Sequence, residues 1–153
     1  MGVIRVLFVC DGNDCLGPMA EGFLRRHGGA AFEVASAGII ARALDPIAVD
    51  VMHRSGIDIS AHRPTAVADL ADRDFDFVIN VSEASREAVS AVANTHRLIH
   101  WRFPDPREGE GTAAETRRRY QRVRDEVAGR VRLFAYAQTR RRERSRDAVS
   151  LPA

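Results

Sequence analysis

The chain has 153 residues and a mass of 16.9 kDa, which is the size of one ordinary domain. Hydrophobic residues make up 45% of it and charged residues 29%, a balance that excludes wholesale disorder. The formal net charge of +2 is too small to indicate a polyanionic partner by itself. No apolar run approaches the roughly 20 residues that a membrane-spanning helix needs, so we expect no membrane association.

Two cysteines, Cys10 and Cys15, lie close together near the start of the chain. Two thiols do not make the disulfide framework of a secreted protein, and without further ligands nearby they do not make a zinc site. The first apolar stretch, residues 3–9, is interrupted by Arg5 and is not a secretory signal. We therefore expect a cytoplasmic protein that binds no metal and uses no cofactor.

Four apolar runs rich in β-branched residues predict strands, at residues 3–9, 32–35, 75–81 and 98–101. Stretches of helical period predict four helices: one entered at Pro18 and ended by Gly28 and Gly29, one from Pro46 to a stop at Gly56, one over about residues 83–92, and the longest from Thr112, with an inward stripe of Thr116, Tyr120, Val123, Val127, Val131 and Phe134. Alternating strands and helices imply right-handed crossovers and a parallel sheet covered on both faces. The sequence therefore predicts an α/β fold, a three-layer sandwich with a short four-stranded parallel sheet.

The C-terminal end differs in composition from the rest. We expect residues 1–138 to form the domain and residues 139–153 to form a basic tail that frays, because the segment from Arg140 to Arg146 is a basic cluster. Weak attraction of this cluster to nucleic acid or to an acidic partner is the alternative. No aromatic residue is interleaved in the cluster, which argues against stacking on single strands, so a nucleic-acid partner is not expected.

The loop after the first strand, residues 10–18, joins that strand directly to a helix. Gly12 and Gly17 permit unusual backbone angles, and Asn13 tolerates a left-handed one. A loop of this length can turn successive N–H groups inward and form an anion nest at the helix N-terminus. Cys10 at its mouth is a candidate thiolate, because helix N-termini lower the pKa of a thiol. A tight connection around a small buried cysteine is the alternative.

Residues 6–21, VLFVCDGNDCLGPMAE, resemble the low-molecular-weight protein tyrosine phosphatases and the related arsenate reductases. Further matching segments are residues 36–38 with 45–48, residues 56–60, residues 75–79, and residues 100–106 with 111–112; the segment from residue 100 is similar to the arsenate reductase branch in particular. The resemblance covers residues 3–135 and implies the phosphotyrosine phosphatase I-like fold. It also implies that Cys10 is the nucleophile, that Asp105 ahead of Pro106 is the general acid, and that the partner is a small oxyanion or a phosphoprotein.

The anion loop itself, Asp11, Gly12, Asn13, Asp14, Cys15, Leu16 and Gly17, departs from the family pattern. Leu16 stands where the family has an arginine whose planar fork grips two oxygens of the anion, and Gly17 stands where it has a serine. Asp11 and Asp14 add negative charge, which raises the pKa of Cys10 and repels an anion. We therefore expect that catalysis is lost or very weak and that the domain acts as a binding or redox-sensing protein.

Two alternatives stay open. The first is an active arsenate reductase or phosphomonoester phosphatase that uses Cys10 and Asp105 with an arginine from another loop, for which the sequence offers Arg42, Arg63 or Arg102. The second is a reversible disulfide between Cys10 and Cys15, which some phosphatase relatives use to protect the nucleophile. For Asp105, a turn residue between two prolines is the structural alternative.

The reductase branch in its thioredoxin-coupled form also needs two further cysteines. At the matching positions this sequence has Ser82 and Val89, which cannot carry out thiol–disulfide exchange. An internal disulfide relay is therefore excluded, whereas reduction by an external small thiol stays open. The sequence predicts no oligomeric state.

Overall fold

The computed structural model describes residues 2–84, 89, 97–150 and 152. Its elements in chain order are β1 (Ile4–Cys10), α1 (Leu16–Gly28), the 3-10 helix η1 (Gly29–Ala31), β2 (Phe32–Gly38), α2 (Pro46–Arg54), the 3-10 helix η2 (Val67–Leu70), β3 (Phe77–Asn80), β4 (Leu98–His100) and α4 (Ala113–Ser150). The predicted strands are all present. The helix predicted over about residues 83–92 lies largely outside the described residues.

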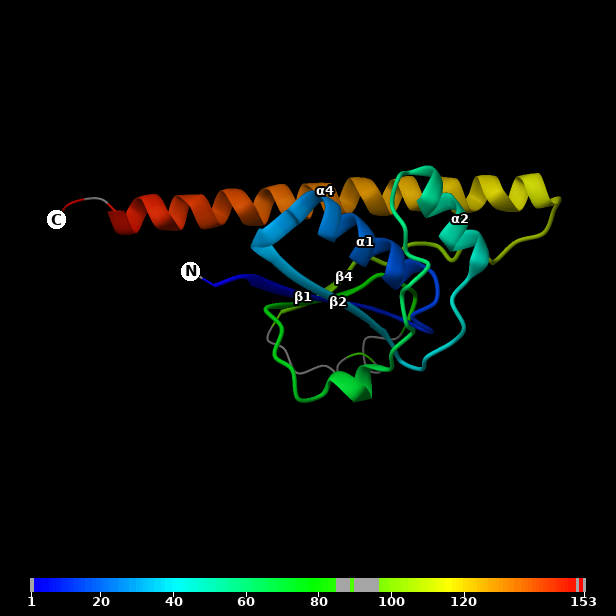
Figure 1. The fold of residues 1–153 in the computed structure, drawn as a ribbon, viewed down its shortest axis with the longest axis horizontal. Helices are drawn as coiled ribbons and strands as arrows, with labels where there is room; N and C mark the ends of the chain where they lie inside the picture. Colours follow the sequence, from blue (N-terminus) through cyan, green and yellow to red (C-terminus); the bar gives the residue numbers. More distant parts are fainter. Residues whose placement is uncertain (1, 85–88, 90–96, 151, 153) are drawn as a thin grey trace.

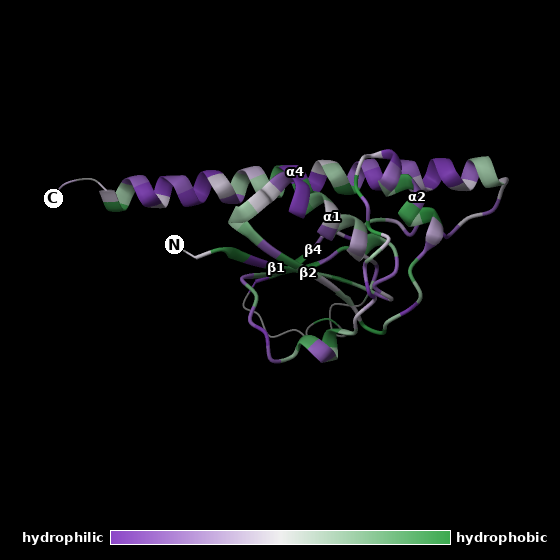
Figure 2. Ribbon diagram, in the orientation of Figure 1, coloured by the Kyte–Doolittle hydropathy of each residue, from purple (hydrophilic) through white to green (hydrophobic). Residues whose placement is uncertain are grey.

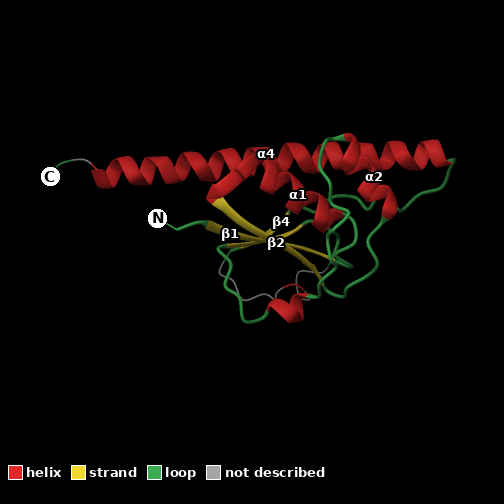
Figure 3. Ribbon diagram, viewed as in Figure 1, coloured by secondary structure: helices red, strands yellow, loops and turns green. Residues whose placement is uncertain are grey.

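The four strands form one parallel sheet in the order β2-β1-β3-β4 (Figures 1 and 3). In its register Cys10 pairs with Gly38 on one side, Val9 pairs with Asn80 on the other, and Asn80 pairs with His100. The carboxyl ends of the strands therefore meet at one edge, which is where parallel α/β sheets place their ligands. The predicted α/β fold around a four-stranded parallel sheet is confirmed.

Apolar side chains cover both faces of the sheet, because β1 sends alternate residues to opposite sides. Val6 and Phe8 belong to the core shared with α1, α2 and α4, which Figure 1 shows together on one side. Leu7 and Val9 belong to a second cluster, which includes Val67 of η2 on the other side. The near-continuous apolar run of the first strand is thus the pattern of a strand buried on both faces.

Helix α4 has an N-cap residue, Thr112, and extends beyond the core of the domain. The Thr112 hydroxyl accepts a hydrogen bond from the Glu115 N–H at 3.1 Å, as an N-cap residue does. The predicted stripe is buried from Tyr120 to Phe134, and Ala135 is also buried. The helix then continues to Ser150 without a break, and Figure 2 shows its last turns as largely hydrophilic. The predicted boundary at residue 138 thus falls inside a helix; fraying of residues 139–153 stays a prediction.

No helix in the described part of the chain combines the length and the apolar character that crossing a bilayer requires.

Candidate functional site

The loop from Asp11 to Cys15 leaves the carboxyl end of β1 and is braced by the segment that follows β2. Three backbone N–H groups of that segment donate to loop carbonyls: Ile40 to Asp11 at 3.1 Å, Arg42 to Gly12 at 2.9 Å, and Asp45 to Asp14 at 2.9 Å. The N–H of Ile39 also donates to the carbonyl of Cys10, at the end of β1, at 3.0 Å. The loop and the end of β2 run so close together that a Cβ on Gly38 would lie 2.7 Å from the backbone nitrogen of Asn13. Glycine at position 38 is therefore required by this close approach.

Asn13 is the residue of the loop with a left-handed backbone, at φ 54°. It is completely buried, and its amide nitrogen donates to the Ser36 hydroxyl at 2.9 Å. Its amide oxygen accepts from the N–H of Thr65 at 2.8 Å and lies 2.9 Å from Nε2 of His62. These contacts to three separate residues fix the turn. Gly12 permits unusual backbone angles but does not have a positive φ; its missing Cβ makes room for Cδ of Arg42, which lies 2.9 Å from the place of that atom.

The thiol of Cys10 receives the N–H groups of the loop. The N–H of Asn13 points at Sγ from 3.1 Å, and the N–H groups of Gly12 and Gly17 also hydrogen-bond the sulfur. Burial, with a smaller contribution from the charge of Asp14, outweighs these three donors and raises the pKa of Cys10 from 9.0 to about 11. The predicted nest of inward N–H groups is therefore present, but Cys10 is a neutral thiol at neutral pH.

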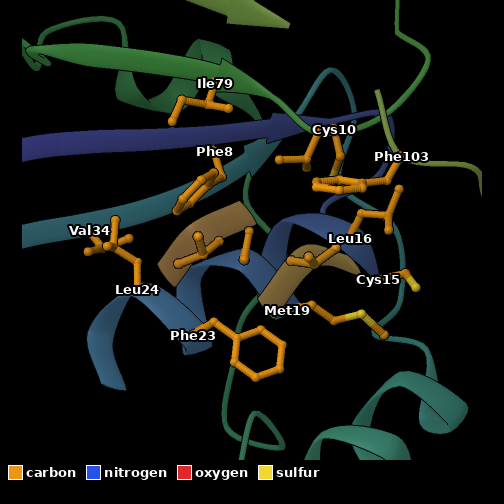
Figure 4. Close-up of a cluster of buried hydrophobic side chains, with 14 of the residues drawn as sticks. Phe8, Cys10, Cys15, Leu16, Met19, Phe23, Leu24, Val34, Ile79 and Phe103 are labelled. Carbon is orange, nitrogen blue, oxygen red and sulfur yellow. The ribbon is translucent and has the colours of Figure 1, made fainter. Parts of the chain in front are cut away.

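Gly17 and Leu16, in the first turn of α1, leave the sulfur without a polar side chain. A Cβ at position 17 would lie 2.9 Å from Sγ of Cys10, so a serine there needs the thiol to shift. Like Gly12, Gly17 does not have a positive φ; it makes room rather than bending the chain. Leu16 is 4% exposed and belongs to the same apolar cluster as Phe103 and Cys10, and Figure 4 shows these three side chains together at one end of the core.

Arg107, which no sequence pattern singled out, joins the two loops of the site. Its Nη1 donates to Oδ2 of Asp14 at 2.6 Å, and its Nη2 donates to Oδ2 of Asp105 at 3.0 Å. The carboxylate side chain of Asp14 is only 6% exposed, so this guanidinium compensates a nearly buried charge. One feature of the sequence could have indicated Arg107: it lies two residues after Asp105, the expected acid, and therefore in the same loop.

The same arginine changes the chemistry of Asp105. Burial raises the pKa of Asp105, but the hydrogen bonds and the charge of Arg107 outweigh burial, and the pKa lies below its ordinary value of 3.8. A general acid has to carry a proton at the operating pH. In this conformation Asp105 is instead an ionised partner of Arg107.

A small cavity of about 40 Å³ lies above Cys10, and its border is acidic. The ionisable side chains bordering it are Asp11, Asp14, Glu83, Asp105, Glu108 and Arg107. In the described part of the chain, five carboxylates and one guanidinium thus border the cavity where the resemblance implies an anion.

None of the three arginines that the sequence offered for this place borders the cavity, although the charge of Arg42 contributes to lowering the pKa of Asp105. Arg42 packs over Gly12, and Arg63 lines a separate pocket of about 870 Å³ beside Ser36 and His62. Arg102 is exposed, with a left-handed backbone at φ 51°. The arginine that borders the cavity and pairs with Asp14 is Arg107.

Cys15 lies behind the loop beside a buried polar pair. Tyr120 of α4 donates to Asp45 at 2.6 Å, and burial together with this hydrogen bond raises the pKa of Tyr120. Burial also raises the pKa of Cys15 well above 9.0, with the charge of Asp45 adding to it. Both cysteines are free and buried, and the Cys10–Cys15 disulfide stays a prediction.

Ser82 and Val89 occupy the places expected for the relay cysteines. The Ser82 hydroxyl accepts from the N–H of Ala84 at 3.1 Å and donates to Asn80 at 3.3 Å, and Val89 is fully buried. Both are structural in their contacts. Among the described residues, no three histidine, cysteine or acidic side chains are grouped so as to hold a metal ion.

The whole arrangement, a strand-end cysteine under a ring of N–H groups and an Asp-Pro loop facing it, agrees with a comparison against known families. Residues 5–145 match the model of the low molecular weight phosphotyrosine protein phosphatases. The chain belongs to this family.

Arsenate reductases are among the curated members of the family that are similar to this chain. That of Bacillus licheniformis is 38% identical over 134 residues, covering 85% of this chain and 94% of the relative. That of Shouchella clausii is also 38% identical, over 130 residues with the same coverage. The resemblance to the arsenate reductase branch is thus confirmed at the level of relatives.

Solved structures agree with this assignment. An arsenate reductase in the phosphate binding state superposes with a TM-score of 0.72 at 27% identity, over 88% of this chain and 98% of that chain. Wzb of Vibrio vulnificus in complex with benzylphosphonate superposes with the same TM-score at 21% identity, over 89% and 99%, and shows the shared fold alone.

Proposed function

We propose that this chain is a family member in which oxyanion chemistry is lost or very weak, and that its altered loop serves in binding or redox sensing. The single observation that carries the proposal is Arg107 bridging Asp14 and Asp105 beside the protonated thiol of Cys10. Among the described residues, Arg107 carries the one guanidinium that borders the pocket, and two carboxylates already neutralise it. A cytoplasmic location and the identity of the partner stay predictions.

The magnitudes favour this proposal over an active enzyme. A thiol with a pKa of about 11 is a thiolate in about one molecule in 10⁴ at pH 7. Loss of one oxyanion donor typically costs about 10²–10³ in rate, and Leu16 and Gly17 remove two polar groups of the family pattern. The acidic border of the cavity then works against entry of an anion.

The test is turnover of p-nitrophenyl phosphate and reduction of arsenate with an external thiol. We expect no turnover by the natural chain that depends on Cys10, and activity in the triple variant Asp14→Ser, Leu16→Arg, Gly17→Ser. The matched control carries Leu16→Gln in place of Leu16→Arg, which adds a polar side chain without a charge. Turnover by the natural chain that vanishes in Cys10→Ser would falsify the proposal.

The position of Arg107 favours one second candidate, an active arsenate reductase or phosphatase that borrows this arginine. Arg107 comes from the loop of Asp105, so its release from Asp14 would turn a guanidinium toward the cavity. Two substitutions separate the candidates. If the natural chain is active, Arg107→Gln abolishes turnover and Asp14→Asn increases it, whereas an inert chain responds to neither.

A further inference from the structure

Charge is unevenly divided between α4 and the rest of the chain. Helix α4 carries 12 of the 23 arginines and only 5 of the 21 acidic residues, although it spans 38 of the 153 residues. The remaining residues carry 11 arginines and 16 acidic residues. A small net charge thus conceals a strongly basic helix on an acidic body, a separation that creates a directed electrostatic field.

Several arginines in the first half of α4 make contacts that stabilise the fold. Arg117 pairs with Asp50 at 3.4 Å, and Arg124 donates to the carbonyl of Val51 at 2.9 Å. Arg130 lies over the ring of Trp101, with its guanidinium carbon 5.5 Å from the ring centroid. These contacts hold α4 onto α2 and the sheet, whereas Arg118, Arg122 and Arg132 are exposed and make no ion pair with a described residue.

The arginines beyond Phe134 have little such structural use. Arg140 pairs with Glu143 of the same helix, and Arg142 donates to the carbonyl of Ala31 at 3.4 Å. Arg141, Arg144 and Arg146 make no ion pair with any residue that the structure describes, and all three are exposed. Figure 1 shows this end of α4 extending past the body of the domain.

A groove continues this basic surface under the helix. It has a volume of about 560 Å³ between the last turns of α4 and the amino ends of β1 and β3. Arg97, Arg141 and Arg142 line it, with a single acidic residue, Asp76, whose carboxylate accepts from the N–H of Arg5 at 2.8 Å. The groove lies at the sheet edge opposite to the loop of Cys10.

We propose that the segment from Arg140 to Arg146, with the groove beneath it, binds the phosphate backbone of nucleic acid. Guanidinium groups suit phosphate oxygens, and phosphate contacts need neither an apolar surface nor the aromatic residues that the segment lacks. Successive helical residues point in directions 100° apart, so these arginines surround the helix and leave no apolar stripe to enter a bilayer. The acidic body repels the same backbone elsewhere and orients it along α4. The proposal is independent of the state of Cys10.

The test measures binding of a short fluorescent DNA duplex, and of one of its strands alone, by fluorescence anisotropy of the full chain. If all five arginines in the segment contact phosphates, raising salt from about 50 mM to about 200 mM weakens duplex binding about 500-fold. Comparing the duplex with the single strand shows which form of the phosphate backbone the segment prefers. Vesicles with anionic phospholipid serve as the competing probe.

The deciding variant is Arg140→Gln, Arg141→Gln, Arg144→Gln, Arg146→Gln, which keeps Arg142 on Ala31. We expect at least a 100-fold loss of affinity at low salt and a fall of about four in the salt slope. The matched control replaces four exposed arginines of the body, Arg5, Arg54, Arg63 and Arg73, and so removes the same charge. The affinity of this control variant for the duplex should fall less than about threefold.

Three outcomes overturn the proposal. The first is that neither form of DNA binds the natural chain at low salt, and the second is that the two fourfold variants lose affinity equally. The third is that anionic vesicles compete more strongly than DNA. Circular dichroism confirms that both variants keep their helices. Should the fourfold variant unfold, Arg144→Glu with Arg146→Glu has to reproduce at least a tenfold loss.

Discussion

The floor and the mouth of the loop after β1 differ in what they retain. The floor, defined by Cys10, Gly12 and Asn13, keeps the inward N–H groups and a completely buried asparagine with all its amide contacts made. The mouth, defined by Asp14, Leu16 and Arg107, has an ion pair and an apolar side chain where the resemblance implies an anion and its arginine. The floor thus has the inward N–H groups that the resemblance implies, whereas the mouth has Leu16 where the resemblance implies an arginine.

The difference teaches which part of a catalytic loop the fold itself requires. Asn13 connects β2, the loop and the segment at His62 and Thr65, so its loss would leave several buried polar groups unsatisfied. Leu16 is instead nearly buried in the apolar cluster with Phe103 and Cys10, so the side chain at position 16 belongs to the core and takes no part in the polar contacts of the loop. The nest is thus held by contacts within the fold, whatever side chain stands at position 16.

The largest expected effect concerns the floor. Asn13→Ala removes the partners of Ser36, Thr65 and His62 and places alanine in a left-handed backbone, so we expect the free energy of unfolding to fall by about 4 kcal/mol. Urea unfolding measures it. Asn13→Gly relieves the backbone strain alone and should cost about 1 kcal/mol less. A loss below about 1 kcal/mol in Asn13→Ala would show that the floor does not depend on this residue.

At the mouth, a smaller loss is expected from Arg107→Gln. The substitution leaves the carboxylate of Asp14 without its guanidinium, and because Arg107 is one-third exposed the cost is about 2 kcal/mol rather than that of a fully buried pair. Adding Asp14→Asn should restore most of this stability. A double-mutant cycle by urea unfolding gives the coupling, and a coupling near zero contradicts the bridge across the mouth.

The acid limb of stability sharpens the same comparison. Arg107 lowers the pKa of Asp105 in the folded chain, so the ionised carboxylate stabilises the fold fully above its ordinary pKa of 3.8, and this stabilisation is lost as the pH falls through the lower folded value. Asp105→Asn should therefore lower stability by about 1 kcal/mol at pH 7 and converge with the natural chain in acid. Asp125→Asn, at an exposed carboxylate of α4, is the control. If the difference in stability between Asp105→Asn and the natural chain instead grows below pH 3.8, the prediction is wrong.

Much of the fold could be predicted because its signals are local and periodic. The strands have apolar runs because both of their faces are buried. Helix α4 has an apolar stripe from Tyr120 to Phe134 because only one of its faces is buried. The meeting of Cys10 with Asp105 could be predicted as well, since parallel strands bring their carboxyl ends together. The end of α4 was harder, because after Ala135 no apolar period remains, and arginine, alanine and glutamate continue the helix by propensity.

The mouth could not be predicted, because its contacts depend on the path of an irregular loop. No pattern in the sequence favoured Arg107 over Arg42, Arg63 or Arg102. All four lie in irregular loops, where no periodic pattern shows which side chain reaches the site. The turn after Pro104 places Arg107 between Asp14 and Asp105, and the backbone of that turn follows from tertiary packing. For the same reason the net effect of Asp14 could be predicted only in part: its charge does raise the pKa of Cys10, but Arg107 compensates it.

The smallest expected effect tests whether the mouth influences the floor at all. The charge of Asp14 contributes to raising the pKa of Cys10, behind burial, so Asp14→Asn should lower that pKa and speed alkylation of Cys10 by iodoacetamide about threefold at pH 8. Asp11→Asn is the matched control, because Asp11 is not among the groups that shift this thiol. Each variant is measured with Cys15→Ser in place, so that one thiol reports. Equal rates in the two variants would mean that burial alone sets the reactivity of Cys10, and that the two halves of the loop act independently.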